Sequence, residues 1–158
     1  MTWPLPNRSG VFLPADCEVI ELLAADAAPT KRQRRMLTPS AEILLVQAGP
    51  RRWFASAGYS LHSGDMRTVG SYPHDIDHDR FPDRDSALQA MAEYLLEGMG
   101  DVFRDSERER KRGLPPKGAT YRIAQTELKE AERVARWAAG LIGEEAPEQL
   151  ELFAASSE

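Results

Sequence analysis

Residues 42–47 read EILLVQ, a short apolar run that lies between Pro39 and the Gly49-Pro50 pair. Runs of this length with turn residues on both sides are typical of buried strands. Residues 53–61 then alternate between apolar and polar positions, which predicts a half-buried strand that pairs with the first through the Gly49-Pro50 turn. Residues 66–72 predict a weaker third strand. We therefore expect a small three-stranded antiparallel meander at the centre of the chain.

Two helical patterns follow the predicted strands. Apolar residues recur at helical spacing along residues 84–112, with Asp83 or Asp85 as the N-terminal cap. The same spacing returns along residues 121–141, and Gly143 is a suitable C-terminal stop. The expected fold class is α+β, in which the two helices cover the meander.

The ends of the chain have a different composition. Residues 1–16 are rich in proline and predict an irregular N-terminal arm, and Asp16 is expected to cap a short helix over residues 18–25. A basic linker follows that helix. Acidic and small residues after Gly143 favour a flexible C-terminal tail. The expected organisation is an arm, short helix and linker over 1–38, the α+β domain over 39–142 and the tail over 143–158.

Composition limits the classes of function. The net charge of the 158 residues is −5, which argues against a protein that coats nucleic acid by bulk electrostatics. Cys17 is the single cysteine, so an intrachain disulfide is excluded and a thiolate metal site is disfavoured. No apolar run approaches the roughly 20 residues that span a bilayer. We expect a cytoplasmic protein without a cofactor and without a membrane partner.

The most specific feature lies in the tail, where residues 149–153 read QLELF between acidic and small residues. Leu150, Leu152 and Phe153 would be exposed on a solvated segment unless a partner receives them. The alternative interpretation is that these three side chains form a last strand or fold back onto the core.

These five residues resemble the pentapeptide Gln-Leu-(Ser/Asp)-Leu-Phe, by which bacterial polymerases, mismatch-repair proteins and replication regulators bind the β sliding clamp. The resemblance implies that Gln149 is the polar anchor, that Leu152 and Phe153 fill a hydrophobic pocket, and that Leu150 is a secondary contact. Glu151 departs from the usual Ser or Asp but keeps a hydrogen-bond acceptor. The resemblance covers only these residues. The first hypothesis is a non-enzymatic accessory or inhibitory protein that binds the clamp through this peptide and acts in replication, repair or the interplay of a mobile element with its host.

A second hypothesis is a small nucleic-acid-binding regulator. A compact basic run in the linker could meet phosphates, and a tryptophan beside two arginines at the hairpin could stack on a base. The residues concerned are Lys31, Arg32, Arg34 and Arg35 in the linker, and Arg51, Arg52 and Trp53 at the hairpin. The alternatives are a solvated linker and a core position for Trp53, which begins an alternating strand.

A third hypothesis is a metal-dependent nuclease or hydrolase built on residues 74–79, which read HDIDHD. His74 and His78 could share a metal ion if the segment were helical. Pro73 and Pro82 bracket the segment, however, so a solvated acidic loop is favoured. The chain shows no sequence pattern of a nucleophilic or phosphate-binding enzyme.

The linker hypothesis has a direct test. Replacing Lys31, Arg32, Arg34 and Arg35 with Ala should weaken any binding to DNA or RNA and flatten its salt dependence, because fewer counterions are released. Fluorescence anisotropy of a labelled oligonucleotide over a range of salt concentrations measures both quantities. Unchanged affinity with an unchanged salt slope would remove the basic run from consideration.

Overall fold

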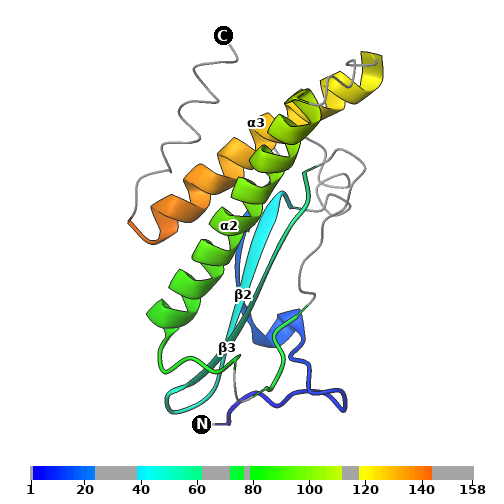
Figure 1. Cartoon of the computed structure of the whole chain (residues 1–158). Coiled ribbons are helices and arrows are strands. Elements are labelled where there is room, and N and C mark those ends of the chain that lie inside the picture. The colour runs from blue at the N-terminus through cyan, green and yellow to red at the C-terminus, as the bar shows by residue number, and fades with distance from the viewer. Residues whose placement is uncertain (1, 24–38, 62–71, 77–78, 112–117, 144–158) are drawn as a thin grey trace.

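The computed structural model describes residues 2–23, 39–61, 72–76, 79–111 and 118–143 (Figure 1). It contains a three-stranded antiparallel sheet in the order β1-β2-β3, together with two long helices. The elements are the 3-10 turn η1 (Pro14–Asp16), the strands β1 (Glu18–Leu22), β2 (Ala41–Gly49) and β3 (Arg52–Tyr59), and the helices α2 (Arg84–Lys111) and α3 (Gly118–Leu141). The α+β fold class expected from the sequence is confirmed.

The β2–β3 hairpin forms where the sequence predicts it. The two strands pair from Ala41 opposite Tyr59 to Gly49 opposite Arg52, with a bulge between Gln47 and Gly49. The extra residue at the bulge increases the local twist of the hairpin next to its turn.

The third strand of the sheet is not the expected one. The sequence predicts a short helix over residues 18–25, but Glu18–Leu22 is strand β1, which pairs antiparallel with β2. The β-branched residues Val19 and Ile20 suit an extended backbone, and the open edge of β2 supplies hydrogen-bond partners that an isolated short helix would lack. The predicted strand over residues 66–72 lies outside the described residues except for Tyr72, which is not in a strand. The region expected to be an arm and linker therefore contributes a strand to the sheet.

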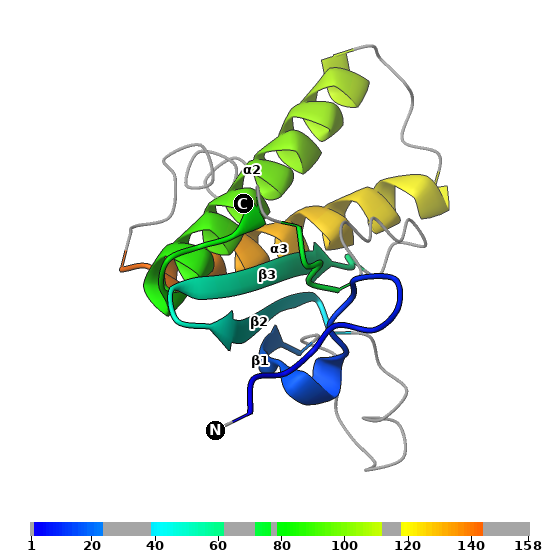
Figure 2. The same cartoon turned by 90° about the horizontal axis from the view of Figure 1, so that it is seen from below.

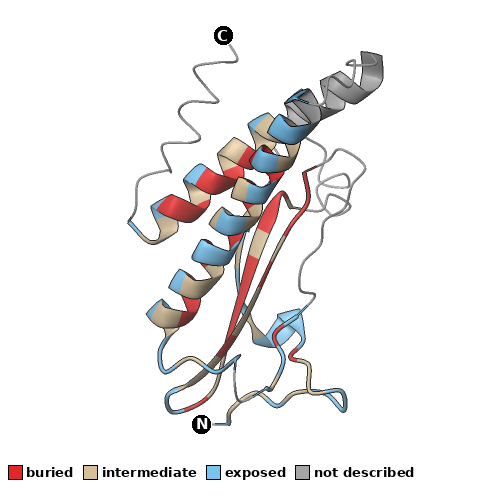
Figure 3. Ribbon diagram, viewed as in Figure 1, coloured by how far each residue is buried: buried red, intermediate tan, exposed pale blue. Residues whose placement is uncertain are grey.

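The main hydrophobic core lies between the sheet and the two helices (Figure 3). Helices α2 and α3 run antiparallel, and α2 packs on β3 and β2 (Figures 1 and 2). The core includes Ile43, Leu45, Ala57 and Tyr59 from the strands, and Leu95, Met99, Val134 and Ala138 from the helices. In the described parts of both helices, no stretch is long and apolar enough to cross a membrane.

A second, smaller core lies on the opposite face of the sheet. The ring of Phe12 stacks on that of Phe54, with 5.6 Å between centroids, and both pack with Val46. The segment that carries Phe12 is held by the segment before α2, because the Phe12 amide donates to the Pro73 carbonyl at 2.9 Å. The N-terminal residues are thereby fixed to the outer face of the sheet.

A partly buried polar contact joins α3 to the residue before β2. The Ser40 hydroxyl donates to Oε1 of Glu130 at 2.5 Å, and Arg133 donates to the same oxygen at 2.9 Å. Ser40 is fully buried, so this hydrogen bond compensates for the desolvation of its hydroxyl group.

Two glycines inside α2 have different surroundings. A Cβ atom on Gly98 would lie 3.0 Å from Cε1 of Tyr59, whereas a Cβ on Gly100 would meet only an Arg104 nitrogen at 3.9 Å. Ala is favoured over Gly in a helix interior by about 0.5–1 kcal/mol. Gly100→Ala should therefore raise the free energy of unfolding by about that amount, and Gly98→Ala should not, because its methyl group crowds the tyrosine ring.

Urea denaturation of the two variants measures this difference, and each serves as the control for the other. Equal stabilisation by both substitutions would contradict the close approach of Tyr59 to α2.

Candidate functional site

The predicted site residues fall into two groups. The clamp-binding candidates Gln149, Leu150, Leu152 and Phe153, the basic run Lys31, Arg32, Arg34 and Arg35, and His78 all lie outside the described residues. The structure describes Arg51, Arg52 and Trp53 at the β2–β3 hairpin, and His74 in the segment before α2. The geometry of a candidate site can therefore be described only around the β2–β3 turn and the segment before α2. We call this region the hairpin end of the molecule.

Arg51 lies in the hairpin turn with φ of 56°. This left-handed conformation costs a residue with a Cβ atom about 1 kcal/mol, and Asn and Gly adopt it more readily. The Arg51 side chain is exposed, so its charge is open to solvent.

Arg52 is committed to contacts within the protein. Its Nη2 lies 2.5 Å from Oδ1 of Asp75, and its guanidinium carbon lies 5.3 Å from the centroid of the Phe54 ring. The ion pair and the cation–π contact hold the guanidinium on the outer face of the sheet. A phosphate would have to compete with Asp75 for this side chain.

Trp53 occupies the other face. Its side chain packs against the main core, and its backbone pairs with Phe81 through hydrogen bonds of 2.9 and 2.8 Å. Successive side chains of a strand point to opposite faces, so Arg52 and Trp53 diverge. The structure does not bring these two side chains together as a basic and aromatic platform.

The histidine and aspartate segment is irregular where it is described, and the Ile76 amide donates to the His74 carbonyl at 2.9 Å to close a tight turn. His74 is exposed and forms an isolated backbone bridge with Val11, and Asp75 is engaged by Arg52. Asp77 and His78 lie outside the described residues. Within residues 2–23, 39–61, 72–76, 79–111 and 118–143, no group of three His, Cys, Asp or Glu side chains is placed to hold a metal ion.

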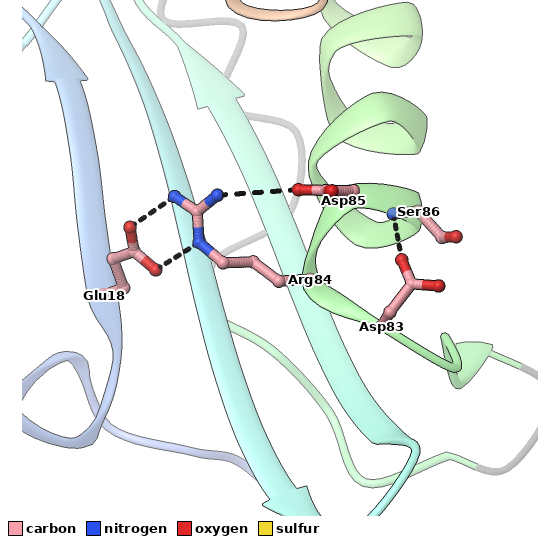
Figure 4. Close-up of polar contacts among 5 residues, drawn as sticks. All are labelled: Glu18, Asp83, Arg84, Asp85 and Ser86. Atoms are coloured by element: carbon pink, nitrogen blue, oxygen red, sulfur yellow. Dashed lines mark hydrogen bonds and ion pairs between the residues drawn. The ribbon is translucent and has the colours of Figure 1, made fainter.

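The first turn of α2 contributes further charged groups (Figure 4). The Asp83 carboxylate accepts the Ser86 backbone N–H at 2.7 Å, which caps the helix. This hydrogen bond, with a smaller contribution from the positive charge of Arg51, holds the pKa of Asp83 below its usual value. Capping by Asp83 agrees with one of the two caps expected from the sequence.

Arg84, the next residue, reaches across the sheet to strand β1. Its Nε and Nη2 donate to the two carboxylate oxygens of Glu18 at 2.9 and 2.5 Å, and Nη1 lies 3.9 Å from Asp85 (Figure 4). Hydrogen bonding to Arg84 lowers the pKa of Glu18, and its partial burial opposes that effect. Sequence analysis missed this pair because 66 residues separate its members and no local pattern links them.

The arginines at this end of the molecule therefore differ in availability. Arg52 and Arg84 are paired with carboxylates. Arg51 and Arg80 are exposed, and among the residues that the structure describes neither has a salt-bridge partner. This arrangement offers two solvated positive charges, of which Arg51 acts on the exposed carboxylate of Asp83, and so it suits only weak contact with an anion.

Comparison with known proteins gives no match, whether the chain is compared with family models, curated proteins or solved structures.

Arg51 and Arg80 can be tested without disturbing the fold. Asn tolerates the left-handed conformation at position 51, so the double variant Arg51→Asn and Arg80→Gln should keep the melting temperature. If the hairpin end contacts nucleic acid, the double variant should lower the slope of log affinity against log salt by about 1 to 2, because up to two phosphate contacts are lost. Oligonucleotide anisotropy measures this slope.

The matched control is Arg52→Gln, which removes the ion pair with Asp75. It should lower the stability modestly, by less than about 1 kcal/mol, and leave the salt slope unchanged. A double variant with an unaltered slope would exclude the hairpin end as a nucleic-acid surface.

Proposed function

We propose that the protein binds the bacterial β sliding clamp through residues 149–153. The observation that carries this proposal is the pentapeptide itself, which has the glutamine, the two leucines and the phenylalanine of the clamp-binding motif in the same order and spacing. A short linear motif acts by inserting a few side chains into preformed pockets, and so its recognition needs no particular fold in the protein that carries it.

The position of the motif in the chain supports the proposal. Helix α3 ends at Leu141, and Gly143 follows with φ of 69°, a backbone conformation that stops a helix. Five residues, including Pro147, then separate Gly143 from Gln149. A motif after a helix stop can reach a pocket on a partner while the preceding domain keeps its own core.

The role that follows is that of a non-enzymatic accessory or inhibitory protein in the bacterial cytoplasm, where replication takes place. By holding the clamp pocket, the protein would compete with other proteins that carry the same motif. Replication, repair and the interplay of a mobile element with its host are the processes in which such competition has an effect.

Nucleic-acid binding is the second candidate function, and the exposed Arg51 and Arg80 are the observation that favours it. It ranks below clamp binding for two reasons. Arg52 and Trp53 lie on opposite faces of the sheet, and the net charge of −5 opposes long-range attraction to phosphates.

The clamp proposal predicts that a synthetic peptide of residues 144–158 binds a bacterial sliding clamp by itself. The dissociation constant should be on the order of micromolar, about −8 kcal/mol, because few side chains are anchored and a short free peptide loses conformational entropy on binding. Phe153→Ala should weaken binding most, by roughly 2 kcal/mol, because it empties a desolvated pocket. Leu152→Ala and Gln149→Ala should follow, the latter because polar groups on the clamp lose their partner. Isothermal titration calorimetry measures each affinity.

Glu151→Ser is the matched control, since it restores the commoner motif and should leave the affinity unchanged or slightly higher. The melting temperature of the full chain should also be unaffected by Phe153→Ala. A large loss of stability for that variant, without detectable clamp binding, would mean that the aromatic ring belongs to the core.

A further inference from the structure

Strand β1 is the least buried element of the sheet. It lies at the edge, it is five residues long, and none of its side chains is fully buried. Ile20 and Leu22 are partly buried against the main core, whereas Val19 on the other face is 45% exposed. The apolar burial that holds β1 in place therefore comes from Ile20 and Leu22, each of them only partly buried.

Two arginines from the helices hold the ends of this strand. Arg84, in the first turn of α2, forms the two-pronged contact with Glu18 where β1 begins. Arg133 of α3 donates to the carbonyl oxygen of Leu23 at 2.7 Å, just after β1 ends. Both contacts are partly exposed to solvent, with 39% of the Arg84 side chain and 37% of the Arg133 side chain accessible. Such contacts add modest stability and can be broken singly.

One pair of facing residues destabilises the pairing of β1 with β2. Glu21 lies directly opposite Glu42, so two carboxylates face each other across neighbouring strands. Like charges in this position are destabilising. Burial, and then the negative charge of Glu21, raise the pKa of Glu42, which shows that its ionised form is disfavoured where it stands.

Strand β1 contributes no fully buried residue to either core. The buried residues of the main core come from β2, β3, the residue Leu61 and the two helices, and those of the small core are Phe12, Val46 and Phe54. Phe12, upstream of β1, is held on the far face of the sheet by its stacking on Phe54. Release of β1 would therefore remove only the partly buried Ile20 and Leu22 from the main core and would leave the N-terminal segment attached.

We propose that β1 is a strap, which opens and closes as a unit on a body of β2, β3, α2 and α3 that stays folded. The contacts of Arg84 and Arg133 favour the closed state, and the facing pair of Glu21 and Glu42 favours the open state. Opening uncovers the backbone edge of β2 from Ala41 to Leu45, a row of unpaired N–H and C=O groups. The strap thus controls whether this edge of β2 is accessible.

Hydrogen exchange of the full chain, followed residue by residue by NMR, tests the strap. The β1 amides that bond to β2 should exchange faster and with a weaker urea dependence than the amides shared by β2 and β3, because their opening exposes less surface. Arg84→Gln should speed exchange in β1 by about twofold to fivefold, the range expected for an exposed ion pair. Glu42→Gln should slow it by a similar factor, since it removes the like-charge contact. Neither variant should alter exchange between β2 and β3.

Two further variants make the outcome specific. Arg84→Lys keeps the charge but loses the two-pronged geometry, and so it should fall between the wild type and Arg84→Gln. Arg136→Gln breaks an exposed salt bridge to Glu132 on α3 and should leave β1 unchanged. The proposal is overturned if β1 exchanges only through global unfolding, or if Arg84→Gln accelerates the whole sheet by one common factor.

Discussion

The fold depends on the need to cover both faces of strand β2. Ile43 and Leu45 point to the helices, Leu44 and Val46 point to the other side, and all four are almost inaccessible to solvent. Each such side chain contributes roughly 1.5–3 kcal/mol when it is removed from water, so neither face can remain open. The helix pair covers one face, and Phe12 covers part of the other.

This constraint explains which elements could be predicted. The β2 and β3 segments have strong apolar patterns with turn residues between them, and both helices have long periodic stripes, so local sequence was sufficient. Residues 18–22 carry too few apolar positions to separate a period of 2 from one of 3.6. The unpaired edge of β2, a feature of the assembled sheet, decides their conformation. Local sequence does not contain that information.

The candidate site was less predictable than the fold, for two different reasons. The opposite orientation of Arg52 and Trp53 follows from strand alternation and is implicit in the sequence. The carboxylates that pair with the arginines cannot be read from the sequence in this way. The tertiary fold brings Asp75 to Arg52 over 23 residues and Glu18 to Arg84 over 66 residues. The proposed clamp binding by residues 149–153 would depend on pockets in another molecule, and so the fold of the domain carries no information about it.

The close approach of Tyr59 to Gly98 fixes the axial position of α2. A shift of the helix by one turn, about 5.4 Å, would bring Tyr94 or Val102 to the place of the glycine, and neither side chain leaves room for the ring. Arg84 lies fourteen residues before Gly98, about 21 Å along the same rigid helix. The close contact at Gly98 thus constrains where Arg84, on the same helix, lies over the sheet. A substitution that displaced α2 at Tyr59 would therefore change the contact between Arg84 and Glu18 of β1, although neither of these two residues is altered.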